Sequence, residues 1–182
     1  MVVTWDRIRY RIKQFAQALL APLFPIDEAY VRSIVGGSLS TPHSEQVEER
    51  LWQLFCRLRR AEQHHAIAVC KALEAEQKWP PELLAAALYH DVGKAIASPR
   101  LLERVWVVVV EHFAPAQAKR WSKGAPRGIG RGFVVRRTHA EWGASLLAEA
   151  GAPQRVVDLV RSHHSPPSAD QALLALERAD DR

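Results

Sequence analysis

Histidine and aspartate side chains stand at the ends of apolar helical segments, where they could bind metal ions. His90 and Asp91 directly follow the apolar run LLAAALY. A carboxylate there is poorly solvated and faces the negative end of the helix dipole, and a bound cation would offset both costs. The alternative is that Asp91 only begins an exposed turn toward Gly93.

Two more histidines fall on inward faces when a period of 3.6 residues is applied. His65 lies on the same side as Val69, whereas the side chain of His64 projects about 100° away. His163 follows aliphatic residues one and two turns earlier, and His164 shares a side with two valines, so both are candidates. A single inward histidine is more often a hydrogen-bonded core residue than a ligand, so each position also has an ordinary interpretation.

An aspartate and a further histidine complete the set. Asp180 lies on the apolar stripe of the last helical segment, seven residues after Leu173 and four after Leu176, and an acid there needs a metal ion or an arginine as partner. His139 begins its segment and could be a ligand or an exposed end residue. Several inward histidines and aspartates together are rare as core filling. Mixed nitrogen and oxygen ligands suit Mn, Fe, Co, Ni or Zn, with Mg as a further possibility.

The elements that position these side chains are predicted to be helices. Apolar periodicity, proline starts and capping patterns predict helical segments over 4–20, 27–35, 42–60, 61–76, 80–92, 99–113, 138–150, 153–164 and from 168 onward. Gly36 and Gly37 are predicted to end the second segment, and Thr138 and Ser168 to begin two later ones. The run VWVVVV could be a strand, but no second strand pattern is present to pair with it. The predicted fold class is therefore all-α.

A basic stretch separates the doublet from His139. Residues 115–137 hold seven Lys or Arg side chains, no acid, and glycines at 128, 130 and 132. This composition predicts a flexible loop that binds anionic groups or is simply solvated. The seven are Lys119, Arg120, Lys123, Arg127, Arg131, Arg136 and Arg137.

Size and composition limit the class of protein. At 182 residues and 48% hydrophobic, the chain suits one domain, or one domain with an extension. The net charge of +5 favours an anionic partner without identifying it. We expect a cytoplasmic protein, because the two cysteines lack CxxC spacing and the sequence has no signal-peptide pattern. No membrane span is expected, since the longest aliphatic run, 105–110, is far shorter than the roughly 20 residues that a span needs. Aromatic residues in 4–20 fit a packed helix better than a base-stacking platform, so nucleic acid is not the expected partner. The oligomeric state stays open.

In order, these motifs resemble the HD superfamily of metal-dependent phosphohydrolases, whose signature is H…HD…D. His65, the His90–Asp91 pair and Asp180 match it within EQHHAIAVCKAL, LLAAALYHDVGK and LLALERADD. HAEWGASLLAEAG and VVDLVRSHH look like the additional histidine motifs of members that hold two metals. The resemblance covers about residues 51–182, so residues 1–50 are predicted to form an N-terminal helical extension.

The resemblance implies an all-α core of about five helices around one or two divalent metal ions. Asp91 would bridge two ions, with His65, His90 and Asp180 completing one site and His139, His163 and, as an open candidate, His164 the other. Lys94 would contact substrate phosphate, and Arg131, Arg136 and Arg137 could bind further phosphates. The implied reaction is hydrolysis of a phosphate ester or anhydride by a metal-activated water, in which Asp91 and Lys94 are the expected catalytic residues.

Departures from named subfamilies narrow the expected substrate. The HH pair is followed by SPPSAD rather than GYP, which argues against the cyclic-di-GMP-degrading branch, and the Glu–Asp motif of alarmone hydrolases is not evident. The order of the extra histidines is most similar to bacterial diadenosine tetraphosphate hydrolases, although the stretch between Lys94 and His139 is long for that group. A nucleotide or dinucleotide is therefore the expected substrate. The alternatives are an HD module that senses a nucleotide or protein, and a protein that binds a membrane or nucleic-acid surface through its basic segments.

Overall fold

The computed structural model describes residues 23–39, 44–98, 101–164 and 169–181. Within these ranges every regular element is helical and no strand occurs, which confirms the predicted all-α fold class. The predicted helix over 4–20 and the start of a helix at Pro42 lie outside the described residues.

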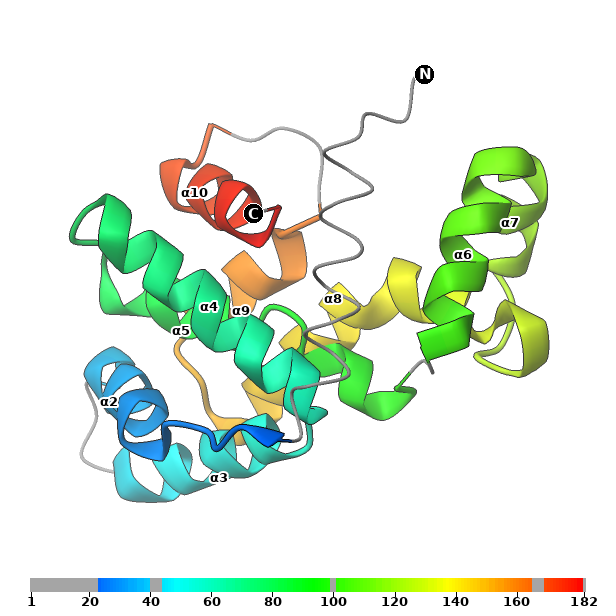
Figure 1. Ribbon diagram of the computed structural model, residues 1–182. Coiled ribbons are helices and arrows are strands. Elements are labelled where there is room, and N and C mark those ends of the chain that lie inside the picture. The colour runs from blue at the N-terminus through cyan, green and yellow to red at the C-terminus, as the bar shows by residue number, and fades with distance from the viewer. Residues whose placement is uncertain (1–22, 40–43, 99–100, 165–168, 182) are drawn as a thin grey trace.

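A main core of helices surrounds a short central helix (Figure 1). Helix α5 (Pro81–Tyr89) is buried along nearly its whole length and contacts α2 (Glu28–Ser38), α4 (Arg60–Glu76), α9 (Gln154–Ser162) and α10 (Gln171–Asp180). A helix that is apolar on all sides is stable only when neighbours cover it. Its three consecutive alanines, 85 to 87, keep those neighbours close, so the end of α5 becomes a meeting point.

Helix α2 shows that a glycine pair need not end a helix. The helix begins as predicted at Asp27, whose Oδ1 accepts a hydrogen bond from the Tyr30 amide at 3.0 Å. It then continues through Gly36 and Gly37 to Ser38, so the predicted stop is wrong. Glycine costs only about 0.5–1 kcal/mol in a helix, which burial of one face of α2 in the core outweighs.

The stretch from 115 to 137 is largely helical rather than a flexible loop. It contains α7 (Pro115–Trp121), the 3-10 turn η3 (Gly128–Gly130) and the first turns of α8 (Arg131–Ala150). Thr138 therefore lies inside α8, where its hydroxyl donates to the Val134 carbonyl at 2.7 Å instead of capping a helix start. The buried residues Phe133, Val134 and Val135 stabilise this earlier start, an apolar run that its basic neighbours obscured in the sequence.

Other helix limits follow the prediction closely. Residues 101–113 form α6 (Leu101–Phe113), so the valine-rich run is helical as predicted. Helix α3 (Ser44–Cys56) ends earlier than residue 60. Pro153 precedes α9 as expected, whereas Asp170 caps α10 by accepting a hydrogen bond from the Ala172 amide at 3.0 Å. The predicted capping residue Ser168 lies outside the described residues.

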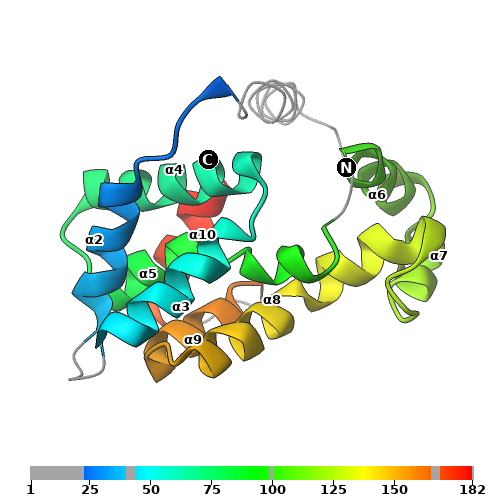
Figure 2. The same cartoon turned by 90° about the horizontal axis from the view of Figure 1, so that it is seen from below.

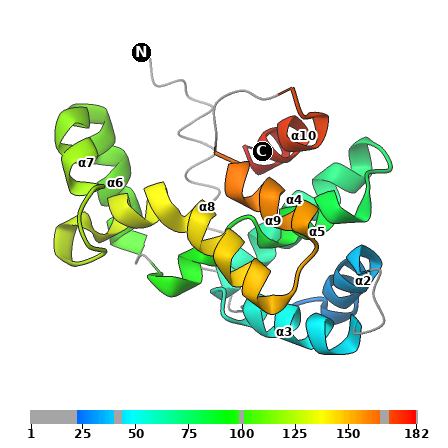
Figure 3. The same cartoon turned by 180° about the vertical axis from the view of Figure 1, so that it is seen from behind.

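Helices α6 and α7 form an arm on the N-terminal half of α8. Figures 2 and 3 show this arm at one end of α8, whereas the other end of α8 packs in the main core. The arm has a small apolar core of its own, in which Val107, Val110, Ala118 and Phe133 are buried beside Trp121. The long helix α8 thus joins two packed regions.

Residues before position 50 contribute to the main core. Val31, Ile34, Val35 and Val47 are buried in the same cluster as residues of α5 and α9. We therefore propose that the extension, taken as residues 1–50, is not independent of the domain at 51–182, because its described helices share one core with it.

Replacing Val35 with Asp tests this proposal. Val35 is fully buried, whereas Ser33 on the same helix is exposed. Val35→Asp should lower the free energy of unfolding of the whole protein by about 3 kcal/mol or more, and Ser33→Asp should change it by about 0.5 kcal/mol or less. Urea unfolding followed by circular dichroism measures both. A main transition that both variants leave unchanged would show that the extension folds separately.

A close backbone contact fixes the segment after the doublet. The 3-10 helix η2 (Val92–Ile96) packs against α8, and a Cβ at Gly93 would lie 1.9 Å from the His139 carbonyl oxygen and 2.7 Å from the Gly143 nitrogen. Backbone atoms cannot yield as a flexible side chain would. Glycine at position 93 is therefore required for η2 to approach α8.

Gly93→Ala should destabilise the protein by about 2–4 kcal/mol because η2 must move away from α8. Gly37→Ala is the matched control, since a Cβ at Gly37 meets nothing within 4 Å and alanine favours a helix. Thermal unfolding of both variants should show a lower melting temperature for Gly93→Ala and an equal or higher one for Gly37→Ala. Equal melting temperatures would contradict the steric argument.

Candidate metal centre

The seven predicted ligand residues come together at the end of α5. Ligand atoms of His65, His90 and Asp180 lie within 4.8 Å of one another, and so do those of His139, His163 and His164. Asp91 lies between the two groups, with Oδ2 3.5 Å from His90 Nε2 and Oδ1 3.5 Å from His139 Nε2. Each oxygen of one carboxylate therefore faces a different group.

Five helices supply these side chains. His65 comes from the middle of α4, His139 from α8, and Asp180 from the last residue of α10. The doublet His90–Asp91 directly follows α5, and the pair His163–His164 directly follows α9. The other core helices pack around α5, so residues that are far apart in the sequence meet at its end. His65 Nε2, for example, lies 2.8 Å from Oδ1 of Asp180, which is 115 positions later.

Three buried histidines share one hydrogen-bond arrangement. Nδ1 of His90 lies 2.8 Å from the Ala87 carbonyl oxygen, Nδ1 of His139 lies 3.0 Å from that of Val135, and Nδ1 of His163 lies 2.6 Å from that of Val160. A carbonyl oxygen only accepts, so each Nδ1 carries the hydrogen and donates it. The tautomer is thereby set, and in the neutral ring Nε2 keeps a free lone pair.

The Nε2 atoms of the same three histidines are buried without a hydrogen-bond partner in the described structure. Leaving a buried polar nitrogen unpaired is costly, and most such atoms in proteins find a partner. Two of the three nitrogens face carboxylates, since His90 Nε2 lies 3.5 Å from Asp91 and 3.3 Å from Asp180, and His139 Nε2 lies 3.5 Å from Asp91. Histidine ligands of metals typically have this form, with one nitrogen held by a carbonyl and the other turned to the ion. The site therefore fits divalent transition metals.

The charge states also fit metal binding. Burial favours the neutral form of Asp91, but Lys94, His90 and His139 outweigh it and hold the pKa of Asp91 well below its usual range. Burial similarly opposes ionisation of Asp180, and His90 and His65 reverse the effect, so the pKa of Asp180 lies far below normal. The buried carboxylate of Asp91 and the partly buried carboxylate of Asp180 are thus both kept anionic.

The histidines divide into two classes. Burial lowers the pKa of His139 and of His163 to about 4, so both rings are neutral at physiological pH, as ligands must be. Burial also lowers the pKa of the more exposed His164 to about 4. For His90 burial acts in the same direction, but Asp91 and Asp180 outweigh it and raise the pKa to about 9. The two carboxylates thus attract a positive charge to His90 Nε2, and a metal ion would replace this proton.

Lys94 places an ammonium group at the edge of the centre. Its Nζ lies 2.5 Å from Asp91 Oδ2, and the side chain is half-buried. It lies on η2, so the Gly93 contact with α8 also fixes its position.

The three arginines predicted to bind phosphate pair with other groups. Arg131 donates to the Ser98 carbonyl, Arg136 Nε lies 3.0 Å from Glu111 Oε1, and Arg137 Nε donates to the Ser122 carbonyl at 2.7 Å. These contacts join α8 to the segment that follows η2, to α6 and to the turn after α7. A role in binding phosphate stays a prediction for these three residues.

Sequence reasoning missed the groups that hold the ligands. The carbonyls of Ala87, Val135 and Val160 and the glycines at 93 and 143 carry no chemical signature. Each hydrogen bond runs from Nδ1 to a carbonyl three or four residues earlier, a partner that almost any helical residue has, so the sequence holds no signal for it. His64 lies at the boundary as predicted, with Nε2 3.3 Å from the Phe24 carbonyl oxygen.

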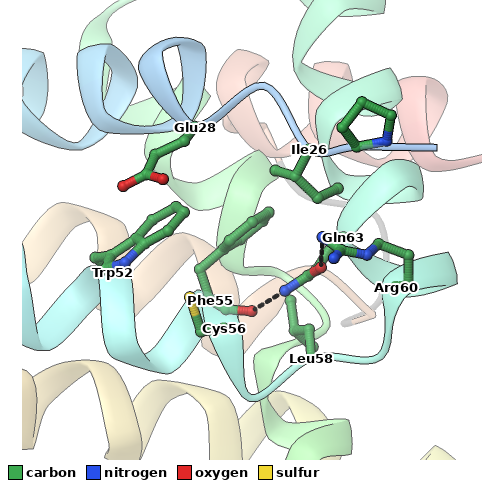
Figure 4. A pocket seen from close by; sticks show the side chains of 9 residues that line it. Ile26, Glu28, Trp52, Phe55, Cys56, Leu58, Arg60 and Gln63 are labelled. Carbon is green, nitrogen blue, oxygen red and sulfur yellow. Dashed lines mark hydrogen bonds between the residues drawn. The ribbon is translucent and has the colours of Figure 1, made fainter. Parts of the chain in front are cut away.

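A separate pocket of about 570 Å³ opens beside α3 and the start of α4 (Figure 4). In its lining, the amide of Gln63 donates to the Phe55 carbonyl at 3.0 Å and accepts a hydrogen bond from Arg60. The seven predicted ligands do not line it. The lining residues are Pro25, Ile26, Glu28, Trp52, Phe55, Cys56, Leu58, Arg60 and Gln63.

Comparison with known proteins agrees with the geometry. The family model described as HD domain matches residues 43–181. Curated proteins and solved structures give no significant match. None of the described helices is long and apolar enough to cross a membrane. Since the family match covers most of the chain, including the residues of both histidine groups, the protein belongs to the HD domain family of the metal-dependent phosphohydrolase superfamily.

Proposed function

We propose that the protein is a hydrolase that uses two divalent transition metal ions to cleave a phosphate ester or anhydride. This proposal rests on three buried Nε2 atoms without a hydrogen-bond partner, two of which, from His90 and His139, lie 3.5 Å from different oxygens of Asp91. His65, His90 and Asp180 would hold one ion and His139, His163 and His164 the other, with Asp91 shared. Ions held there would supply a Lewis acid and would lower the pKa of a coordinated water.

The protein's own groups would orient and neutralise the substrate. The carbonyl hydrogen bonds to Nδ1 fix the direction of three rings, so the site is largely formed before substrate arrives. Lys94 can turn from Asp91 toward a phosphoryl oxygen, because its ammonium group is at the exposed edge of the centre. The positive charge would then stabilise the negative charge that develops on phosphoryl oxygens during cleavage.

The expected substrate is a small nucleotide or dinucleotide. This proposal rests on the resemblance of the histidine motifs to those of diadenosine tetraphosphate hydrolases and on the net charge of +5. The test is hydrolysis by the full-length protein of p-nitrophenyl phosphate, mononucleotides and diadenosine polyphosphates, with Mn, Fe(II), Co, Ni, Zn or Mg supplied in turn. Release of phosphate or nucleotide that depends on the added ion supports the proposal.

Asp91→Ala should remove both ions and reduce hydrolysis by at least about 100-fold, because one carboxylate serves both sites. Metal content is measured by elemental analysis after equilibration with the activating ion, and activity on the best substrate of the panel. Circular dichroism checks that the variant is folded. Full turnover by a folded Asp91→Ala protein would overturn the proposed mechanism.

Asp180→Asn should remove only the ion held with His65 and His90, so the metal content should fall from two ions to one per chain. Asp181→Asn is the matched control, since the neighbouring carboxylate is exposed. His163→Ala should remove the other ion and leave the first. Loss of both ions in Asp180→Asn, or of none, would contradict the assignment of ligands to two groups.

A further inference from the structure

Helix α6 is apolar on two sides. Val107 and Val110 are buried in the arm's own core, where a Cβ on Gly132 of α8 would meet Val107 at 2.7 Å. The acids of α6 also face α8, since Glu103 pairs with Arg131 at 3.6 Å and Glu111 with Arg136 at 3.0 Å. One side of α6 is therefore fully used in holding the arm to α8.

The side of α6 that faces away from α8 carries an exposed apolar stripe. At 100° per residue its members span about 100° of the helix surface. Phe113 is 79% exposed and Leu102 81%, and the others are between 41% and 49% exposed. The acids at 103 and 111 lie off this stripe. Trp106 at its edge also packs within the arm, since its ring lies 6.2 Å from that of Trp121 on α7. The stripe consists of Leu102, Val105, Trp106, Val109 and Phe113.

The spacing of the stripe suits pairing with an identical helix. Leu102, Trp106, Val109 and Phe113 follow one another at intervals of four, three and four residues, which is the a/d spacing of a coiled-coil seam. This series reads the same in both directions. In an antiparallel pair about a two-fold axis, Leu102 of each copy would face Phe113 of the other, and Trp106 would face Val109.

The available area is enough for such a pair. From the exposed fractions, the stripe offers on the order of 500 Å² of apolar surface per chain. Two chains would then bury about 1,000 Å², which is the lower limit for a specific interface. A dimer of modest affinity, dependent on protein concentration, is what this area supports.

We propose that the protein forms a two-fold dimer through antiparallel packing of α6 against α6 of a second copy. The Figure 1 view supports access, since α6 and α7 project from the main core. The metal centre takes its ligands from α4, α5, α8, α9 and α10 and none from α6, so dimerisation is independent of the proposed hydrolase activity.

Sedimentation velocity of the full-length protein over a range of concentrations tests the dimer. The wild-type protein should shift from monomer toward dimer as its concentration rises. Val109→Glu, at the centre of the stripe, should raise the dissociation constant at least about 30-fold. Val108→Glu is the matched control, because Val108 is 39% exposed against 41% for Val109 but points about 100° away. A wild-type protein that stays monomeric at all concentrations, or equal effects of the two variants, would overturn the proposal.

Disulfide cross-linking tests the antiparallel arrangement. In a Cys56→Ser background, which removes the exposed native thiol, Leu102→Cys and Phe113→Cys proteins are mixed and oxidised. Antiparallel pairing should give 102–113 cross-links in the mixture and little 102–102 or 113–113 product. Predominant like-with-like cross-linking would contradict it.

Vesicle flotation tests whether the apolar stripe of α6 binds a membrane instead of a second copy of the protein. Lys119, Arg120, Lys123 and Arg127 are exposed near the arm and could attract anionic lipid. Vesicles of phosphatidylserine and phosphatidylcholine are the probe. A monomeric protein that floats with these vesicles, and loses this binding in Val109→Glu but not in Val108→Glu, would show that the stripe faces lipid instead of a second copy.

Discussion

The structure depends on keeping an anionic carboxylate in the protein interior at the end of α5. Asp91 is only 5% exposed and stands at the negative end of a helix dipole, two features that disfavour its charge. Three neighbours hold it ionised, namely Lys94, His90 and His139. The carboxylates of Asp91 and Asp180 raise the pKa of His90, whereas burial lowers the pKa of His139 and His163, so these two rings stay neutral. A pair of metal ions would satisfy this need and would leave the rings as neutral ligands.

The surrounding fold can be understood as the means of bringing partners to that carboxylate. The alanines of α5 allow α4, α9 and α10 to approach its end closely, and they bring His65, His163 and Asp180 with them. The Gly93 backbone lies directly against α8, which sets His139 on the opposite side of Asp91 from His90. Small residues at a few positions therefore matter as much to the centre as its ligands. A larger side chain at either place would separate the groups without removing any of them.

The convergence of the candidate ligand side chains could be predicted from sequence because burial and charge disagree at those positions. An acid on an apolar stripe, such as Asp180, or after an apolar helix, such as Asp91, needs a partner, and helical periodicity identifies its face. The limits of helices were harder to predict because local signals compete with packing. Gly36 and Gly37 do not end α2, since burial of one face outweighs their cost. The stretch 115–137 was predicted to be a loop because basic residues dominate its composition. It is largely helical, and burial of Phe133 and its neighbours stabilises the start of α8. A contact such as Gly93 with His139 depends on two segments 46 positions apart, so local periodicity could not reveal it.

Different parts of the long helix α8 contact the candidate metal centre and the arm. The middle of α8 presents His139 to the centre and its C-terminal part packs in the main core, whereas its first turns hold the arm through Phe133 and Arg131. Because α6 and α7 supply no member of either histidine group, residues on the outer face of the arm are free of the constraints that burial and charge impose at Asp91. Most of the exposed apolar stripe there makes no contact that holds the fold, and only Trp106 at its edge packs within the arm, with its ring 6.2 Å from that of Trp121. Exposure of this apolar stripe to water is unfavourable unless another surface covers it. Because its residues follow one another at intervals of four, three and four, the α6 helix of a second copy is the surface that fits it.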